Sequence, residues 1–377
     1  MEKLNIVVLC GGESVESDIS IITGVQVYNS LDANKYNKHL IYIDSNGVWW
    51  KCGHCESAKE VLDCKKVEVA LKLGDSNLFL IKGRKLKLDF KIHCAVLALH
   101  GGYGENGTIQ GILRMCKIPF TTGDNISCAV AMDKCYTKLI LKGAKVKVLP
   151  FEVVNKFDFY EDENSVIEKV ESHINYPCIV KPSCLGSSIG ITVAHNQSEL
   201  RDAIHFAFKF DNKLLIEKAL TDFIELNISA RLLNGNVVLS EIEKPLKQDE
   251  ILSFNDKYVA GSKSKLQGLN SGSKGMASLQ REVPAVIEEE TTQMVKALTK
   301  KAYDLFNLKG IVRCDFLLDS NGRIYLNEIN SIPGSLSFYL WGKENFSSVL
   351  DEEISEAIKR KLLDDTIIKK FESSVLQ

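Results

Sequence analysis

The sequence lacks a hydrophobic run long enough to cross a membrane. A transmembrane helix needs roughly 18 or more consecutive apolar residues, and no segment of the 377 residues reaches that length. A charge excess is also absent, because 47 basic and 49 acidic residues give a net charge of −2. We therefore expect neither a membrane nor a nucleic-acid partner. The N-terminal apolar stretch ends at Gly11-Gly12, which indicates a first strand and no signal peptide.

A complete zinc motif is missing as well. Cys52, His54, Cys55 and Cys64 could form a zinc knuckle, but no second CxxC completes a set of four ligands at the usual spacing. A surface hairpin with incidental thiols is the favoured interpretation. Most of the eleven cysteines lie inside apolar runs, as expected of buried free thiols in a reducing compartment.

The length of the chain predicts two or three domains, because one core rarely serves 377 residues. The first part alternates apolar β-rich runs with helical patterns, which predicts an α/β fold with a parallel, doubly wound sheet. Ligands bind beyond the carboxyl ends of such strands. The expected strands are 4–9, 38–43 and 90–99, and the expected helices are 17–31 and 108–116.

The pattern changes after about residue 120. Residues 248–284 are polar and aperiodic, which indicates a functional lid or a disordered segment. The remaining expected helices are 127–144, 288–306 and 347–362, and the expected strands are 177–180, 191–193, 214–217, 225–233, 310–318 and 323–330.

The last two strands form a hairpin that gathers polar side chains on one face. Arg313 and Asp315 are two residues apart on one strand, and Glu328 and Asn330 on the other, while their neighbours are mostly apolar. Carboxylate and amide oxygens suit Mg²⁺ together with phosphate oxygens. An Arg beside such a metal can neutralise a phosphoryl group in transfer. A solvated salt-bridge face would explain the charges, but not the rigid turn that follows Asn330.

A second segment fits phosphate chemistry. Lys181 ends an apolar strand, and Gly186-Ser187-Ser188-Ile189-Gly190 follows it. Backbone N–H groups of such a loop can bind phosphate oxygens. The loop is not a P-loop, because GxxxxGK[ST] is absent.

These motifs resemble the ATP-grasp superfamily and, within it, the D-alanine–D-alanine ligase family. Gly11–Glu16 is similar to the family's N-terminal signature, and His100–Thr108 to its HGxxGEDGT block, with Asn106 where Asp is usual. Ala131–Lys134 and Lys181–Gly190 resemble its two lysine segments. The hairpin resembles its metal-binding hairpin, so the resemblance covers almost the whole chain.

The resemblance implies an α/β (α+β), three-domain ATP-grasp fold with an N-terminal Rossmann-like parallel sheet domain. Residues 1–120 would form this pre-ATP-grasp domain, 121–212 the central ATP-grasp subdomain, and 213–377 the C-terminal ATP-grasp domain with lid loop and metal site. It further implies a cytoplasmic enzyme of peptidoglycan precursor synthesis that is a homodimer. Its cofactors would be ATP and two Mg²⁺ ions, with Mn²⁺ as an alternative.

The resemblance also assigns nucleotide and metal roles. For ATP, it assigns Lys134 and Lys181 to the phosphates, Glu217 to the adenine, Glu225 to the ribose and Lys257 to the lid. For the two metal ions, it assigns Asp315, Glu328 and Asn330.

For the amino-acid substrates, Glu16 would receive the ammonium of the first D-alanine in a hydrogen-bonded group with Ser187 and Tyr258. His100 would line the same site, Arg313 and the Gly334 N–H would stabilise the tetrahedral intermediate, and Tyr339 would lie at the second substrate.

The implied reaction activates D-alanine as an acyl phosphate, which the amine of a second D-amino acid attacks. The sequence departs from the family on the acceptor side, where Tyr339 replaces the usual Ser and the lid after Tyr258 is long and basic. A related ligase with D-serine, D-lactate or a larger amine as acceptor is therefore an alternative. A non-catalytic ATP-binding protein is a further alternative, which the intact hairpin disfavours.

Overall fold

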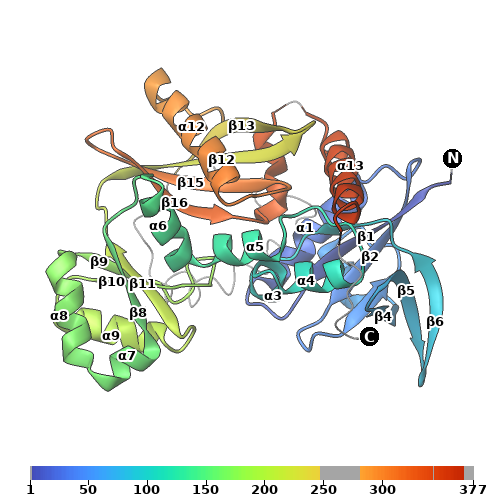
Figure 1. Cartoon of the computed structure of the whole chain (residues 1–377), viewed down its shortest axis with the longest axis horizontal. Helices are drawn as coiled ribbons and strands as arrows, with labels where there is room; N and C mark the ends of the chain where they lie inside the picture. Colours follow the sequence, from blue (N-terminus) through green and yellow to red (C-terminus); the bar gives the residue numbers. More distant parts are fainter. Residues whose placement is uncertain (1, 247–280, 343, 369–377) are drawn as a thin grey trace, which may run out of the picture.

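The computed structural model describes residues 2–246, 281–342 and 344–368. These residues form sheets of seven, four and five strands, each with helices packed against it (Figure 1). The four-stranded sheet and its helices form a separate lobe, drawn in green in Figure 1, whereas the other two sheets lie closer together.

The centre of the first sheet is parallel, as predicted. Strand β1 (Leu4–Gly11) lies between β2 (Tyr36–Ile43) and β7 (Cys94–Leu97) and pairs with both in parallel. Its side chains from Ile6 to Cys10 are buried. Helix α1 (Ser17–Ser30) follows β1 and packs on it, so the turn after β1 lies at the carboxyl edge of these strands.

An antiparallel extension of this sheet was not predicted. Four strands continue it beyond β2, in the order β3 (Trp49–Cys52), β4 (Lys66–Lys72), β5 (Asp75–Lys82) and β6 (Lys85–Lys91), and the short helix α2 (Ala58–Asp63) lies between β3 and β4. The single strand expected over 90–99 was wrong, because β6 and β7 occupy opposite edges of the sheet. One apolar run therefore contains two strands with different neighbours.

The four-stranded sheet carries the glycine-serine loop. Its order is β10 (Thr192–Ala194), β9 (Cys178–Pro182), β11 (Lys213–Lys218) and β8 (Phe151–Asn155), with antiparallel neighbours. The loop lies between β9 and β10. Strand β11, which was expected on the C-terminal side of a boundary at 212, hydrogen-bonds within this sheet. The lobe's helices are α7 (Lys156–Glu161), α8 (Glu163–His173) and α9 (Gln197–Ala207).

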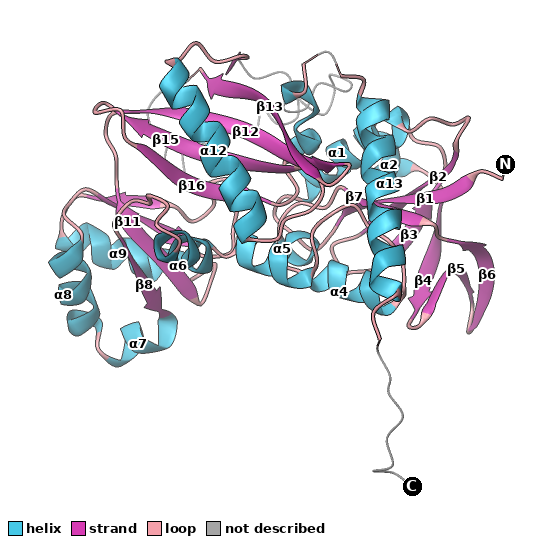
Figure 2. Cartoon of the chain, turned by 45° about the horizontal axis from the view of Figure 1, so that its top comes forward, coloured by secondary structure: helices cyan, strands magenta, loops and turns pink. Residues whose placement is uncertain are grey.

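The five-stranded sheet carries the polar hairpin and is covered by the long helix α12 (Glu289–Leu305), as Figure 2 shows. Its order is β14 (Arg281–Glu282), β13 (Asn236–Pro245), β12 (Phe223–Leu233), β15 (Val312–Asp319) and β16 (Ile324–Asn330).

The helix expected over 127–144 is two helices. Helix α5 (Asn125–Met132) ends before Asp133, and α6 (Lys134–Gly143) begins after it. Asp133 has an extended backbone and accepts a hydrogen bond from the Tyr136 amide at 3.0 Å, so it caps α6. This break makes Lys134 the first residue of a helix. The other helices before α5 are α3 (Gly102–Glu105) and α4 (Thr108–Met115).

The C-terminal segment returns to the first sheet. After β16 the chain forms the short helix η2 (Gly334–Leu340) and helix α13 (Phe346–Asp365). Arg360 of α13 donates to the carbonyl oxygens of Thr122 at 3.0 Å and Phe120 at 2.8 Å. Side chains of the C-terminal segment, including Ile332 and Leu350, belong to the core of the first sheet. Within the described residues, no helix is long and apolar enough to cross a membrane.

Candidate active site

The hairpin β15–β16 brings its four polar residues together as predicted. Asp315 lies opposite Glu328, and Arg313 opposite Asn330. The Arg313 guanidinium donates from Nε and Nη2 to the two Asp315 carboxylate oxygens, each at 2.7 Å, and Asn330 Nδ2 donates to Asp315 Oδ2 at 2.9 Å. The interleaved residues, such as Cys314, are buried in the core of the sheet.

The oxygen atoms of this face suit a hard cation. Asp315, Glu328 and Asn330 supply two carboxylates and an amide, and Mg²⁺ commonly combines so few protein oxygens with water and phosphate oxygens. Among the described residues, no group of three or more His, Cys, Asp or Glu side chains could hold a metal ion by itself. The three thiols Cys52, Cys55 and Cys64 are free, and the zinc-knuckle alternative gains no support.

Two lysines lie beside the hairpin. Lys134 at the start of α6 places Nζ 3.8 Å from Glu328 Oε2 and donates to the Leu185 carbonyl oxygen at 2.5 Å. It thereby joins the hairpin to the glycine-serine loop. Lys181 of β9 forms an ion pair with Glu217 of the neighbouring strand β11. Both ammonium groups are partly accessible, as a phosphate-binding group must be.

Glu217 binds a second lysine that the sequence analysis did not single out. Lys138 Nζ lies 3.1 Å from Glu217 Oε2, and each side chain is 1% exposed. Burial alone would raise the pKa of Glu217, but the positive charges of Lys138 and Lys181 have the larger, opposite effect. The pKa of the Glu217 carboxyl is therefore lowered to about 2. Lys138 lies four residues after Lys134, on the same helix face. This spacing is the signal that could have identified it.

Glu225 lies on β12, which pairs with strand β15 of the hairpin β15–β16. Its neighbour two residues along, Asn227, lies directly opposite Asp315. Burial, together with the negative charge of Asp315, raises the pKa of the Glu225 carboxyl. Lys257 and Tyr258, the two predicted lid residues, lie outside the described residues.

Glu16 and Ser187 meet although 171 residues separate them. Ser187 Oγ donates to Glu16 Oε1 at 2.5 Å. Glycines surround the carboxylate, because a Cβ at Gly101 would lie 2.7 Å from Glu16 Oε2 and one at Gly186 2.8 Å from it. Small residues at these positions allow the glycine-serine loop and the end of β7 to approach Glu16.

His100, in the segment that follows β7, is buried. Thr23 Oγ1 of α1 lies 2.8 Å from His100 Nε2, and His100 Nδ1 lies 2.8 Å from the Ile332 carbonyl oxygen. Burial lowers the pKa of His100 to about 4, so the ring is neutral near pH 7. The ring therefore links the first sheet to the segment after the hairpin.

Glu105 is a second such link, and the sequence analysis assigned it no role. Its carboxylate accepts from the Gly101 amide at 2.8 Å and from the Ile332 amide at 3.1 Å. Burial raises the pKa of Glu105 to about 7. The residue lies in the HGxxGEDGT-like block, and that block was the available signal.

The segment after the hairpin has an unusual backbone. Ser335, Leu336 and Ser337 have φ values of 53°, 47° and 49°, in the left-handed region that disfavours residues with a Cβ. The Ser335 amide donates to Thr23 Oγ1 at 3.0 Å. Strain of this kind persists where surrounding contacts determine the conformation, and here it shapes the turn that begins at Gly334.

Tyr339 turns its ring toward Arg281. The Arg281 guanidinium lies 4.0 Å from the ring centroid, within cation–π distance. Arg281 Nη1 also lies 2.7 Å from Glu243 Oε1. Arg281 and Glu243 were not predicted as site residues, because contacts between β13, β14 and η2 are not encoded in any local motif.

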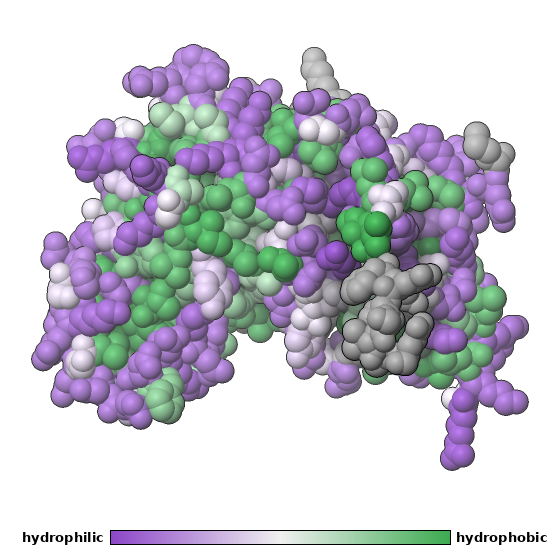
Figure 3. Space-filling view, in the orientation of Figure 1, coloured by the Kyte–Doolittle hydropathy of each residue, from purple (hydrophilic) through white to green (hydrophobic). Residues whose placement is uncertain are grey.

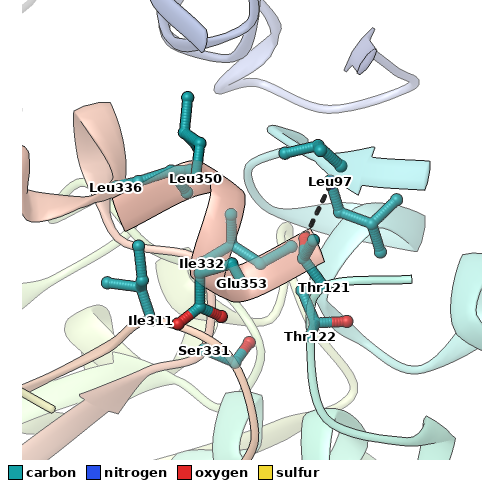
Figure 4. A pocket seen from close by; sticks show the side chains of 10 residues that line it. Leu97, Thr121, Thr122, Ile311, Ser331, Ile332, Leu336, Leu350 and Glu353 are labelled. Carbon is teal, nitrogen blue, oxygen red and sulfur yellow. Dashed lines mark hydrogen bonds between the residues drawn. The ribbon is translucent and has the colours of Figure 1, made fainter. Parts of the chain in front are cut away.

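A small pocket is lined by residues of this segment together with residues of β7 and α13. Figure 4 shows Ile332, Leu336 and Leu350 facing Thr121 and Thr122 across it. Glu353 of α13 also lines the pocket, and burial raises its pKa to about 8. The pocket is mostly apolar, so the hairpin face remains the better candidate for chemistry.

Hydrophilic and hydrophobic side chains are unevenly distributed on the face of the molecule drawn in Figure 3. In the space-filling view, hydrophilic side chains dominate the rim of the molecule and hydrophobic ones gather toward its middle (Figure 3). The polar cluster described above takes its side chains from strands of two sheets, β9, β11, β15 and β16, and from Lys134 at the start of α6.

Comparison with known proteins agrees with this geometry. The model of the D-ala D-ala ligase N-terminus matches residues 5–123, and that of the D-ala D-ala ligase C-terminus matches residues 140–345. A D-alanine–D-alanine ligase of Thermosipho africanus is 36% identical over 370 residues, which cover 95% of each chain.

Solved structures show the same fold. The D-alanine–D-alanine ligase from Coxiella burnetii matches with a TM-score of 0.77 at 23% identity, covering 97% of each chain. The VanG D-Ala:D-Ser ligase from Enterococcus faecalis matches with a TM-score of 0.78 at 23% identity, covering 94% of this chain and 100% of that one. These likenesses confirm the expected ATP-grasp fold. The chain belongs to the D-alanine–D-alanine ligase family of ATP-dependent ligases.

Proposed function

We propose that this enzyme joins D-alanine to a second D-amino acid, with D-alanine as the principal acceptor, and converts ATP to ADP and phosphate. A carboxylate is a poor electrophile, so it must be activated before an amine can attack it. One carboxylate oxygen of the first D-alanine attacks the γ-phosphorus of ATP, ADP leaves, and a D-alanyl phosphate forms. The amine of the second substrate then attacks the acyl carbon, and phosphate leaves.

One observation carries this proposal. The oxygen-rich face of the hairpin and the Lys134 ammonium converge, with Nζ 3.8 Å from Glu328 Oε2. This is an arrangement for phosphoryl transfer, in which positioning and charge stabilisation do most of the work. Lys134 and Lys181 bind the phosphates, Glu217 and Glu225 bind the adenine and ribose, and Lys257 belongs to the lid.

Asp315, Glu328 and Asn330 would hold two Mg²⁺ ions, or Mn²⁺ in their place. Bound metal would neutralise phosphate charge. Arg313, fixed by two hydrogen bonds to Asp315, is oriented to stabilise negative charge on the tetrahedral intermediate together with the Gly334 N–H.

Glu16 receives the ammonium of the first D-alanine, with Ser187 and Tyr258 completing the hydrogen-bonded group. The Ser187–Glu16 hydrogen bond supports this role. His100 lines the same site in its neutral form. Tyr339 lies at the acceptor side, where D-serine, D-lactate or a larger amine remain the alternatives.

The products would serve peptidoglycan precursor synthesis. We also infer a cytoplasmic location, where ATP and reduced thiols occur together, and a homodimer, by family resemblance. Light scattering on the purified chain tests the last point.

The function is tested by measuring ADP release with Mg²⁺-ATP across a panel of D-amino acids, with L-alanine as control. The proposal predicts D-alanine-dependent ADP release and the D-alanyl-D-alanine dipeptide as the main product. ATP binding without ADP release in the presence of any amino acid would contradict it and favour a non-catalytic ATP-binding protein. Release with another acceptor in preference to D-alanine would identify the alternative ligase.

A further inference from the structure

Lys138 of α6 is a buried ammonium group beside the nucleotide side of the site. Its Nζ lies 3.1 Å from Glu217 Oε2 and donates to the Leu326 carbonyl oxygen at 3.3 Å. Burial of a charge is strongly unfavourable unless the charge is paired and hydrogen-bonded. Both contacts are therefore needed to keep this lysine charged in the interior.

Glu217 holds two ammonium groups at once. Lys181 binds Oε1 and Lys138 binds Oε2, from β9 and α6 respectively. The two lysines differ in exposure, because the Lys181 side chain is 12% exposed and that of Lys138 is 1% exposed. Lys181 can therefore turn toward a ligand, whereas Lys138 is fixed in the interior.

ATP binding would create a conflict for Lys181. It is the residue proposed to bind the phosphates, and while it does so it cannot neutralise Glu217 to the same extent. A buried carboxylate that loses its counter-ion is strongly destabilised. A second, immobile cation on the other carboxylate oxygen removes this conflict.

We propose that Lys138 is a positioning residue that keeps Glu217 charged and in place for the adenine while Lys181 moves to the ATP phosphates. This inference rests on the proposed function, because it takes Lys181 and Glu217 as nucleotide-binding residues. Lys138 itself contacts neither substrate. Its effect on ATP therefore passes through Glu217.

A packing role is the competing explanation. Lys138 also joins α6 to β16 through Leu326, and loss of that contact would weaken the site whatever residue stands at 217. The two roles are separated by whether the effect of Lys138 depends on the charge of Glu217. A double-mutant cycle measures this dependence directly.

The experiment measures Mg²⁺-ATP affinity by titration calorimetry on the full-length enzyme, without D-alanine. The variants are Lys138→Met, Lys138→Arg, Glu217→Gln and the double variant Lys138→Met/Glu217→Gln. The control is Lys142→Met, which removes a lysine from the exposed face of the same helix. Thermal unfolding checks that each variant folds.

We expect Lys138→Met to weaken ATP binding by about 30-fold, the size of a lost hydrogen bond between charged groups. Lys138→Arg should restore most of the affinity, and Lys142→Met should bind as the wild type does. In the Glu217→Gln background the Lys138→Met change should cost less than about threefold. In steady-state assays with varied ATP, Lys138→Met should raise KM for ATP and leave kcat nearly unchanged.

If Lys138→Met costs the same affinity in the wild-type and Glu217→Gln backgrounds, Lys138 acts through packing and the proposal is overturned. Wild-type affinity in Lys138→Met would overturn the proposal as well. If Lys138→Met does not fold, the same cycle uses Lys138→Gln, which keeps a donor for Leu326 and lacks the charge. Because the assay measures ATP binding alone, a wild-type enzyme that binds ATP but does not ligate D-alanine would contradict the proposed function and not this inference.

Discussion

Thr23 Oγ1 lies 2.8 Å from His100 Nε2 and accepts a hydrogen bond from the Ser335 amide at 3.0 Å. The Thr23 hydroxyl is therefore free to donate its proton to His100 Nε2. The neutral His100 ring then carries its own proton on Nδ1. That proton is donated to the Ile332 carbonyl oxygen. One buried network thus fixes the chain on both sides of Gly334.

Substitution of Thr23 by Val should disrupt this network with little change in shape. It leaves the Ser335 amide and His100 Nε2 without their partner, and a buried unsatisfied polar group costs about 1–3 kcal/mol. We expect a loss of about 2 kcal/mol in the free energy of unfolding and a fall in kcat/KM. Thr23→Ser keeps the hydroxyl and serves as the control. Equal stability and activity of the Val and Ser variants would contradict the network.

The pKa of His100 predicts a dependence of stability on pH. Burial lowers its pKa to about 4 in the folded protein, against about 6.5 in an unfolded chain. Between these values the unfolded chain binds a proton that the folded protein does not, so stability falls as the pH falls from 6.5 to 4. The full effect is about 3 kcal/mol.

Comparison with His100→Asn isolates this contribution, because Asn keeps a donor for Ile332 and does not titrate. The free energy of unfolding, measured with denaturant at several pH values, should fall more steeply for the wild type below pH 6.5. Glu105 titrates in both proteins and largely cancels in the difference. Parallel pH profiles would show that His100 is not the group responsible.

Glu328→Gln tests the proposed metal site. Glu328 would hold Mg²⁺ together with Asp315 and Asn330, because its strand places it opposite Asp315 and on the same side as Asn330. A metal supplies several kcal/mol to phosphoryl transfer, so we expect turnover to fall by at least about 1,000-fold with an unchanged fold. Glu241→Gln, on an exposed position of β13, should be fully active. Near-normal activity of Glu328→Gln would remove Glu328 from the site.

Tyr339→Ser tests the acceptor pocket. The ring lies on the Arg281 guanidinium, so its removal both enlarges the pocket and frees Arg281 to reorient. We expect a changed preference among acceptor D-amino acids and nearly unchanged affinity for the first D-alanine, because a site built around a hydrogen bond discriminates through that partner. Product analysis with mixed acceptors measures the preference. Tyr339→Phe separates the ring from the hydroxyl, and an unaltered profile in Tyr339→Ser would place the residue outside the pocket.

Local patterns predicted much of this molecule. Alternation along 310–330 placed Arg313, Asp315, Glu328 and Asn330 on one face, and the structure confirms that arrangement. Helix α1 and strand β1 agree with their expected ranges to within two residues. Such features follow from sequence because the side-chain period of a strand or helix is fixed by its backbone.

Features that depend on long-range contacts were missed. The run 90–99 looked continuous, yet it contains the end of β6 and the whole of β7, which lie at opposite edges of one sheet. The helix over 127–144 looked unbroken, yet Asp133 caps a new helix there and pairs with Lys213 from β11 at 2.5 Å. The contacts of Thr23, Glu105 and Lys138 depend on partners far away in the sequence, namely Ser335, Ile332 and Glu217.

In the proposed reaction, the carboxylate of the first D-alanine is phosphorylated before the peptide bond forms. Ser187 Oγ donates to Glu16 Oε1, and the proposal assigns this pair to the ammonium of the first D-alanine and not to attack on an acyl group. D-Alanine labelled with ¹⁸O in its carboxylate tests the claim most directly, by mass spectrometry of the phosphate released during turnover with Mg²⁺-ATP. Each phosphate should carry one ¹⁸O atom, because the bridging oxygen of the acyl phosphate comes from D-alanine. Unlabelled phosphate alongside labelled dipeptide would contradict it.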